Sequence, residues 1–260
     1  ASLLVRMRQT TGVDFSGYKT DTLTRRWRQR RQELQLDTPG AYLALVRQQP
    51  DELHILQQRF LVSVSSFVRN RAAFAALAQA WRGGRSAAQQ RPFRCWVPAC
   101  ASGEEACSLV MLHEEGRRAG HWQGEIEVLG SDLNPQALAQ AREGLYAPGA
   151  LREVDADWRE RYFSREGPRW RVADSVRARL RFERANVLDA VPPGPWDMVS
   201  CRNLLIYLKK PCQDRLLHAF HAALAPGGWL MVSPAESLSQ DHLRLFTPHD
   251  IAHRIYRRQA

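Results

Sequence analysis

The sequence has none of the long apolar runs that mark a membrane protein. No stretch of its 260 residues approaches the ~20 apolar residues of a membrane-spanning helix. Nor does it contain an internal repeat or a low-complexity tract. With 44% hydrophobic and 25% charged residues, its composition is that of an ordinary soluble globular protein. We therefore expect no membrane insertion, and one large domain or two smaller ones.

Cysteine is scarce and irregularly spaced. There are five cysteines, and no two of them form the close C-x-x-C pair that a zinc site needs. An odd number without regular pairing is typical of reduced thiols. The sequence therefore predicts a cytoplasmic protein without a metal centre, in which Cys95, Cys100, Cys107, Cys201 and Cys212 remain thiols.

Acidic residues are too few to balance the basic ones. The chain holds 37 Lys and Arg against 27 Asp and Glu, a net charge of +10. The excess is concentrated in residues 1–80, which carry twelve basic and six acidic residues and so a net charge of +6. A basic N-terminal region predicts an acidic partner. Nucleic acid, an anionic membrane and an acidic protein surface all satisfy this condition.

Helical signals fill the first third of the chain. Pro39 follows Thr38 and is well placed in a first helical turn, and residues 70–81 are rich in alanine. Residues 82–92 then gather small, polar and helix-breaking residues, which is typical of a linker. We predict a helical N-terminal domain over residues 1–81, a linker over 82–92 and a second domain over 93–260.

From Phe93 onward, short apolar strands alternate with helical segments. Strands are expected over residues 93–97, 126–130, 196–200 and 229–232, with a last edge strand over 251–256. Such alternation predicts an α/β fold with a mostly parallel sheet and helices on both faces. Residues 160–184 break the alternation with three short strands, the last over 180–183. We predict a small antiparallel β-subdomain there.

Residues 95–106 combine a strand, a turn of small residues and the start of a helix. A doubly wound α/β fold binds its ligand at such a turn. A turn that binds pyrophosphate offers bare N–H groups, whereas Glu104 and Glu105 would repel phosphate. Carboxylates suit a ligand that is cationic or rich in amine and hydroxyl donors, and S-adenosylmethionine carries a sulfonium and an ammonium. The alternative is an ordinary acidic helix N-terminus.

Polar residues also end later strands of the predicted sheet. Asp132 follows the second strand, where an acid commonly binds ribose hydroxyls. Its alternative role is a helix N-cap, for which it competes with Asn134. Asn186 ends another strand, and its amide offers a donor and an acceptor to an adenine edge. The alternative for Asn186 is a simple turn residue.

Residues 200–207, with the sequence Ser-Cys-Arg-Asn-Leu-Leu-Ile-Tyr, follow the fourth strand. Such a loop faces the ligand crevice of a parallel sheet, and its polar residues are poorly suited to a pure core. Tyr207 fits either the site or packing under the sheet. Arg69 precedes the last helix of the first domain, and by itself it fits a solvated arginine.

Together these segments resemble the chemotaxis-receptor glutamate methyltransferases, the CheR family. The resemblance covers nearly the whole chain, and many ordered motifs at compatible spacing make it specific. The matching motifs are residues 11–19, 65–69, 103–105, 130–134, 141–146, 200–207, 225–228 and 233–237.

The resemblance implies a class I, Rossmann-like S-adenosylmethionine-dependent methyltransferase domain behind an all-helical domain, with a small antiparallel β-subdomain. It implies methyl transfer to a receptor glutamate, giving a γ-glutamyl methyl ester and S-adenosylhomocysteine, the reaction of a protein-glutamate O-methyltransferase in chemotaxis. It assigns orientation of the incoming carboxylate to Arg69 and Tyr207. The implied cofactor-binding residues are Ser63, Ser65, Arg69, Ala99, Gly103, Glu104, Asp132, Asn186, Val187, Arg202 and Asn203.

An arginine-rich helix gives the basic N-terminal region a candidate purpose. Its basic residues are Arg25, Arg26, Arg28, Arg30 and Arg31. By resemblance the methylated glutamates lie on Glu-rich chemoreceptor coiled coils, where a basic helix would dock by electrostatic complementarity. The alternative is a solvated helix face. The short loop at residues 166–168 predicts that this protein does not use a C-terminal receptor pentapeptide as a tether.

The chain departs from the family pattern at Ser63, Val68, Ala99 and Cys107, where an Asn, an aromatic residue, a Gly and a Tyr are usual. These departures suggest one alternative, a non-catalytic module that senses S-adenosylmethionine or docks to receptors. The high pI suggests another, an RNA methyltransferase. Aromatic residues interleaved with basic ones are missing from residues 1–80, so we expect no nucleic-acid partner.

Overall fold

The computed structural model describes residues 3–61, 63–82 and 91–259, and most of the predicted linker, residues 83–90, lies outside them. The chain divides into two compact units. The first unit is Ala1–Val62 with Tyr207–Gln213, and the second is Ser63–Ile206 with Asp214–Ala260. Residues 63–81, which the sequence analysis groups with the helical N-terminal domain, therefore belong to the second unit. No helix of the described ranges has the length and apolar character needed to cross a membrane.

Helices make up most of the first unit. They are α1 (Leu3–Thr11), α2 (Thr20–Glu33), α3 (Pro39–Gln48) and α4 (Glu52–Phe60). Helix α3 begins as the sequence predicts, with Pro39 in its first turn and the Thr38 side chain accepting the Ala41 N–H at 3.1 Å.

The segment around Tyr207 completes the first unit. The Lys19 N–H donates to the Tyr207 carbonyl at 2.8 Å, and the Lys209 N–H donates to the Gly17 carbonyl at 2.9 Å. These backbone bonds attach residues 207–209 to the loop before α2 as a short antiparallel bridge. Tyr207 is therefore held by the helical unit, although it is far from it in sequence.

A buried ion pair joins three helices of the first unit. Arg30 on α2 donates from Nε and Nη2 to the two carboxylate oxygens of Glu52 on α4, at 2.8 Å each. The Tyr42 hydroxyl on α3 donates to the same carboxylate at 3.0 Å. Burial raises the pKa of Glu52, and the bonds from Arg30 and Tyr42 lower it to a net value below the ordinary one. Arg30 is thus committed to holding the helices together.

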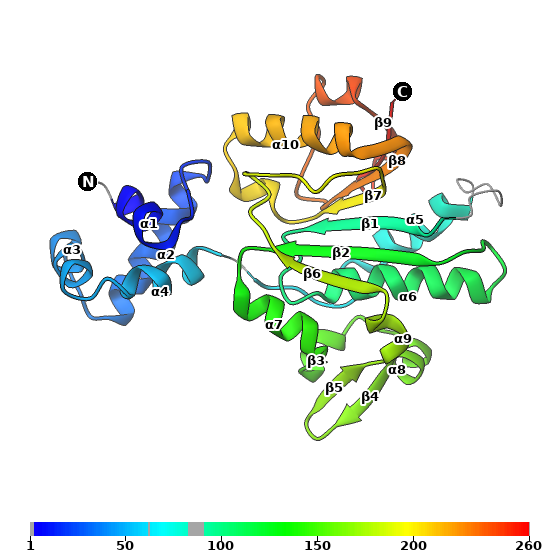
Figure 1. The fold of residues 1–260 in the computed structure, drawn as a ribbon, viewed down its shortest axis with the longest axis horizontal. Helices are drawn as coiled ribbons and strands as arrows, with labels where there is room; N and C mark the ends of the chain where they lie inside the picture. Colours follow the sequence, from blue (N-terminus) through cyan, green and yellow to red (C-terminus); the bar gives the residue numbers. More distant parts are fainter. Residues whose placement is uncertain (1–2, 62, 83–90, 260) are drawn as a thin grey trace. The chain divides into compact units, whose positions relative to one another are not determined.

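The second unit is built on a seven-stranded sheet (Figure 1). Its strands, in spatial order, are β6 (Leu180–Arg184), β2 (Ile126–Asp132), β1 (Phe93–Pro98), β7 (Trp196–Cys201), β8 (Leu224–Val232), β10 (Ile255–Arg258) and β9 (Phe246–Asp250). The strands from β6 to β8 run parallel, and the last two are antiparallel. The predicted α/β fold with a mostly parallel sheet is confirmed. The single edge strand predicted over 251–256 is wrong, since two strands flank a turn there.

Helices cover the sheet on both sides. After residue 63 the helices of the chain are α5 (Arg71–Arg82), α6 (Glu104–Arg118), α7 (Pro135–Glu143), α8 (Ala156–Tyr162), α9 (Asp174–Arg177) and α10 (Lys210–Ala223), and the short 3₁₀ turns are η1 (Pro148–Leu151), η2 (Leu205–Tyr207) and η3 (His242–Arg244). Figure 1 shows α6 and α7 on one side of the sheet and α10 on the other. Trp96 of β1 is fully buried and packs edge-on against Phe220 of α10 at 5.4 Å.

A separate three-stranded antiparallel sheet confirms the predicted β-subdomain. Its order is β3 (Leu145–Tyr146), β5 (Arg169–Val172) and β4 (Phe163–Glu166). The strand predicted within it over 180–183 belongs instead to the main sheet, as β6. The reason is packing: the Phe182 ring lies over Gly130 of β2, where a Cβ atom would come within 2.7 Å of it.

Four of the five cysteines are buried in the second unit. Cys95, Cys100, Cys107 and Cys201 are buried, and Cys212 on α10 is half-buried. Burial raises the pKa of the Cys107 thiol to about 12, and it raises the pKa of Cys100 and Cys201 as well. These three thiols therefore remain protonated at neutral pH.

The Arg30–Glu52 pair predicts a stability effect for the first unit. Replacing Arg30 with Ala leaves a buried carboxylate without its cation, so we expect the free energy of unfolding to fall by about 3 kcal/mol. Because the pKa of Glu52 is lowered in the folded protein, the stability from this pair is present above the ordinary Glu pKa and is lost as pH falls through the lowered value. Urea unfolding followed by tryptophan fluorescence measures both effects.

Arg25→Ala on the exposed face of α2 is the matched control. It is expected to change stability by less than about 0.5 kcal/mol. Equal effects of the two substitutions would contradict a structural role for Arg30.

Candidate functional site

The loop after β1 has a backbone conformation that residues other than glycine seldom adopt. Ala99, Ala101 and Gly103 all have positive φ angles, of 53°, 50° and 89°. The Cys100 N–H donates to the Ser131 carbonyl at 3.0 Å, which ties the loop to the end of β2. A Cβ atom at Gly103 would lie 2.9 Å from both Ala141 and Phe182, so only glycine fits that position. The result is a tight turn that presents the N-terminus of α6 at the carboxyl edge of the sheet.

Asp132 joins this loop to the one that follows β2. Its Oδ2 accepts the Ala101 N–H and its Oδ1 accepts the Asn134 N–H, both at 2.8 Å. The residue is 9% exposed, and burial raises its pKa despite these bonds. Asn134 caps α7 by accepting the N–H groups of Gln136 and Ala137. Of the two candidates for the helix cap, the structure thus selects Asn134 and leaves Asp132 between the two loops.

Glu104 is a buried carboxylate with neutral partners. It is 3% exposed, and the Ser102 hydroxyl lies 2.8 Å and 2.9 Å from its two oxygens. The Ser65 hydroxyl also bonds to it, and burial raises its pKa above the ordinary value. The Tyr146 hydroxyl, donating to the Ser102 carbonyl at 2.6 Å, fixes the turn that carries this group. A buried carboxylate held by hydroxyls retains acceptor capacity for a cationic ligand.

The segment 63–70 packs beside these carboxylates within the second unit. Asn134 Nδ2 donates to the Ser63 hydroxyl at 3.0 Å, and Ser65 bonds to Glu104. Val68 N–H donates to the Ser108 hydroxyl of α6 at 2.9 Å. The structure therefore brings the predicted residues Ser63 and Ser65 to the same edge as Glu104 and Asp132.

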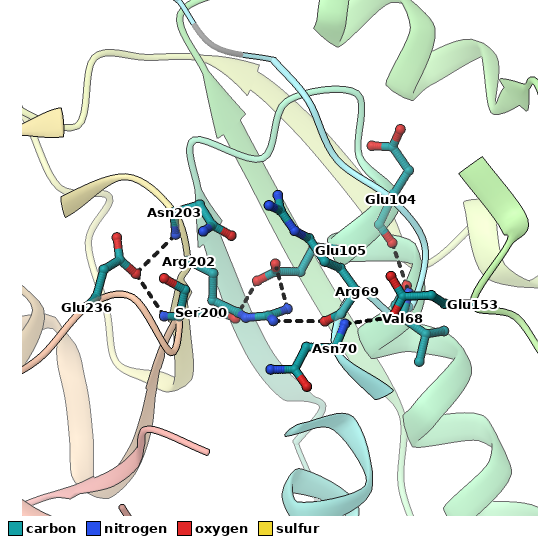
Figure 2. Close-up of polar contacts among 12 residues, drawn as sticks. Val68, Arg69, Asn70, Glu104, Glu105, Glu153, Ser200, Arg202, Asn203 and Glu236 are labelled. Atoms are coloured by element: carbon teal, nitrogen blue, oxygen red, sulfur yellow. Dashed lines mark hydrogen bonds and ion pairs between the residues drawn. The ribbon is translucent and has the colours of Figure 1, made fainter. Parts of the chain in front are cut away.

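Arg69 is half-buried, and one of its guanidinium nitrogens donates to the Val64 carbonyl at 3.3 Å. Figure 2 shows its side chain directed away from the Arg202 guanidinium, toward the same side of the view as the Glu104 side chain. Its own backbone carbonyl accepts a bond from Arg202 Nη2 at 2.8 Å. The backbone of Arg69 is thus held by a hydrogen bond from Arg202, whereas the hydrogen bond that its side chain donates to Val64 is long.

Arg202 lies just beyond the end of β7 with its side chain 2% exposed. Besides the Arg69 carbonyl, its guanidinium contacts Glu105 at 3.2 Å (Figure 2). It also lies over the Phe74 ring of α5 at 5.6 Å. The Ser200 hydroxyl bonds to the same Glu105 carboxylate at 2.5 Å. The two glutamates of the turn therefore have different surroundings, since Glu105 faces a cation and Glu104 faces hydroxyls.

Glu236 is a residue of this edge that sequence reasoning did not single out. It is buried, and it accepts the N–H groups of Asn203 at 3.0 Å, Leu205 at 2.7 Å and Ser233 at 2.8 Å (Figure 2 draws the first). Asn203 has a φ of 62°, a conformation that asparagine tolerates better than most residues. The sequence pattern that points to Glu236 is an acidic residue within the short Ser-Pro-Ala-Glu-Ser segment that follows a buried strand.

Asn186 and Val187 lie in the turn after β6. The Asn186 amide donates to Asp189 at 3.0 Å and accepts the Leu188 N–H at 3.1 Å, so its hydrogen-bonding groups are engaged within the turn. Val187 is half-buried in the same turn. This geometry corresponds to the turn-residue alternative for Asn186.

The remaining predicted residues belong to the first unit. Tyr207 is held there by Lys19, whereas Arg69 lies in the second unit. Among the arginines of α2, Arg25 and Arg28 are exposed, while Arg26, Arg30 and Arg31 are partly buried. Arg31 lies over the Trp27 ring at 5.3 Å. The exposed charge of this helix therefore comes mainly from two of the five predicted docking arginines.

Two family models match the chain side by side. "CheR methyltransferase, all-alpha domain" matches residues 1–61, and "CheR methyltransferase, SAM binding domain" matches residues 63–254. The junction between the two matches falls where the chain passes from the first unit to the second.

Three relatives are each 32% identical to the chain. An uncharacterized 104.1 kDa protein of Rhodobacter capsulatus matches 88% of this chain, which spans 24% of that protein. A chemotaxis protein methyltransferase of Klebsiella aerogenes matches 89% of this chain over 80% of its own length. A probable biofilm formation methyltransferase WspC of Pseudomonas putida matches 88% of this chain over 54% of its own length. The chain thus spans about a quarter of the first relative and about half of the third.

The positive φ of Ala99 predicts a stabilising substitution. A left-handed conformation costs an L-residue roughly 1–2 kcal/mol, and glycine escapes most of this at a smaller entropic cost. Ala99→Gly is therefore expected to raise the free energy of unfolding by about 0.5–1 kcal/mol. Urea unfolding of the full chain measures it.

Ala106→Gly, in the regular backbone of α6, is the matched control and is expected to destabilise by about 1 kcal/mol or more. If both substitutions destabilise equally, the strain argument for the loop fails.

Proposed function

The chain belongs to the CheR methyltransferase family, and we propose that it methylates glutamate side chains on the cytoplasmic helical bundle of a chemoreceptor, forming γ-glutamyl methyl esters. The protein is a methyltransferase, and its cofactor is S-adenosylmethionine. The observation that carries the proposal is the presence of both family domains in order over residues 1–61 and 63–254. The name of the Klebsiella relative supports chemotaxis as the setting.

The buried carboxylates of the second unit fit this cofactor. We assign Glu104 to the cofactor's ammonium and Asp132 to its ribose hydroxyls, because both are buried acceptors whose partners are neutral hydroxyls or N–H groups. The positive-φ turn at Ala99 and Gly103 lets the backbone approach a ligand closely. We assign the turn of Asn186 and Val187 to the adenine side, with the Asn186 amide holding the turn through Asp189 and Leu188. When bound, the cofactor supplies an electrophilic methyl group on its sulfonium.

The remaining chemistry is positioning. A receptor glutamate with an ordinary pKa near ~4.3 is already ionised at neutral pH and needs no general base. With the cofactor bound, a bond from the glutamate's carboxylate oxygen to the methyl carbon would replace the carbon–sulfur bond, whose electron pair would stay on sulfur to give S-adenosylhomocysteine. Orientation of the carboxylate then sets the rate. We assign this orientation to Arg69, whose guanidinium donates charge-assisted hydrogen bonds, together with Tyr207.

The basic first unit suits an acidic receptor surface. Arg25 and Arg28 are the exposed arginines of α2, and they give the helix a positive face for a Glu-rich bundle. In the β-subdomain, β4 and β5 are joined by a tight turn at Gly167, which has a φ of 56°. This short turn supports binding without a C-terminal receptor pentapeptide.

Arg69→Ala tests the assignment of substrate orientation. Loss of the orienting guanidinium is expected to lower methyl transfer to receptor-enriched membranes by about 100-fold, since small misplacements of reacting groups have effects of this size. Transfer of labelled methyl from S-adenosylmethionine measures the rate. Base-labile label identifies the product as an ester.

Arg71→Ala is the control, because Arg71 is an exposed neighbour paired with Asp155. It is expected to retain the wild-type rate. Full activity of Arg69→Ala would refute its role, and base-stable label would refute the glutamyl ester.

The raised pKa of Glu104 predicts a pH dependence of cofactor binding. Below that pKa the carboxyl is protonated and no longer pairs with the ammonium, so affinity should fall as pH decreases through the raised pKa, and binding should release protons in that range. Asp132, whose pKa is also raised, contributes with the same sign. Calorimetry in buffers of different ionisation enthalpy measures both the affinity and the protons released.

Glu104→Gln should weaken binding at pH 7.5 by roughly 10- to 100-fold, the range for a hydrogen bond to a charged group, and should flatten the pH dependence. Glu114→Gln, on the same helix but paired with Arg117, should change neither. An unchanged pH profile in Glu104→Gln would exclude Glu104 as the ammonium partner.

A further inference from the structure

We propose that Arg202 is a positioning residue for methyl transfer, acting through the backbone of Arg69 rather than through contact with the cofactor. This inference rests on the proposed function, in which Arg69 orients the substrate carboxylate. It also reassigns Arg202, which the family resemblance places in the cofactor pocket.

The backbone around Arg69 is strained and needs outside support. Val68 has a φ of 52° and Asn70 a φ of 66°. A positive φ is a genuine outlier for a β-branched residue such as valine. Such conformations persist only where surrounding contacts over-determine them, and they cluster at functional sites.

Three contacts hold the N–H groups of this turn. Phe67 N–H donates to the Ala150 carbonyl at 3.0 Å. Val68 N–H donates to the Ser108 hydroxyl, and Asn70 N–H donates to the Glu153 carboxylate, both at 2.9 Å (Figure 2). All three acceptors lie on or beside other elements of the second unit, so the N–H side of the turn is anchored from α6 and from the η1 region.

The carbonyl side of the turn is held by Arg202. Its Nη2 donates to the backbone carbonyl of Arg69 itself, at 2.8 Å. This bond orients the Arg69 peptide plane, and therefore the direction in which the Arg69 side chain leaves the backbone.

Arg202 is itself fixed on several sides. Its guanidinium pairs with Glu105, which also accepts from Ser200, and it lies over the Phe74 ring. Behind it, Glu236 accepts the Asn203 N–H and holds the chain at the end of β7. Its planar fork reaches Glu105 and the Arg69 carbonyl together, which a lysine ammonium does not reproduce. The pair thus links β7, α6 and the Arg69 turn into one support.

The test compares Arg202→Gln, Arg202→Lys and Glu105→Gln with the wild type. Methyl transfer to receptor-enriched membranes gives kcat, calorimetry gives the Kd for S-adenosylmethionine, and hydrogen exchange reports on the Val68 and Asn70 amides. Arg202→Gln is expected to lower kcat by about 30-fold or more through misplacement of Arg69, to leave Kd within threefold, and to speed exchange of both amides. Arg202→Lys should show smaller changes of the same kind.

A double variant separates positioning from general damage. Because Arg202 acts through Arg69, adding Arg202→Gln to Arg69→Ala should lower kcat by less than about twofold more. Additive losses, a Kd that rises in parallel with the loss of kcat, or unchanged amide exchange would each overturn the proposal. If Arg202→Gln does not fold, Arg202→Lys and Glu105→Gln provide the same comparisons.

Arg91→Gln is the matched control. Arg91 forms a two-bond ion pair with the buried Asp197 near the opposite end of the same strand β7, at 2.5 Å and 2.7 Å. Its loss should lower stability without changing kcat or the exchange of the Val68 and Asn70 amides. If the wild type does not methylate receptors, only the proposed function is refuted. The amide-exchange comparison still tests the positioning role, because it needs no substrate.

Discussion

The second unit depends on one constraint: the loops at the carboxyl edge of its parallel strands must satisfy their backbone N–H groups without closing the edge to a ligand. Buried carboxylates meet this constraint. Asp132 bonds the loops after β1 and β2, Glu236 bonds those after β7 and β8, and Glu153 bonds the Arg69 turn. A carboxylate accepts two or more N–H groups at once and adds negative charge, so the scaffold that shapes the edge also selects against phosphate.

The first unit uses the same chemistry for a different purpose. The Glu52 carboxylate gathers Arg30 and Tyr42 and so ties three helices together. An arginine-rich helix is therefore divided between charges that hold the fold and charges that face solvent. The division helps to explain how a strongly basic helix remains packed, because the Arg30 charge is neutralised by Glu52 and Arg31 is stacked on the Trp27 ring.

Much of the fold could be predicted because its signals are local. Alternating strands and helices predicted the parallel sheet, and the small residues before Glu104 predicted the turn between β1 and α6. Features that depend on distant partners could not be predicted. Two of the backbone groups that Glu236 accepts lie about thirty residues earlier, and the partner of Arg30 is Glu52 on another helix. The short strand β6 has the pattern of either sheet, and the packing of Phe182 against Gly130 decided between them.

The buried cysteines have a practical consequence for covalent chemistry. Thiol reagents attack the thiolate, and burial keeps Cys100, Cys107 and Cys201 protonated and out of reach. Cys212, half-buried at the start of α10, is the most accessible thiol of the five. It lies in the segment Tyr207–Gln213 that belongs to the helical unit. A maleimide dye or spin label added to the unaltered sequence would therefore attach within the segment that carries Tyr207, giving a spectroscopic reporter without any engineered cysteine.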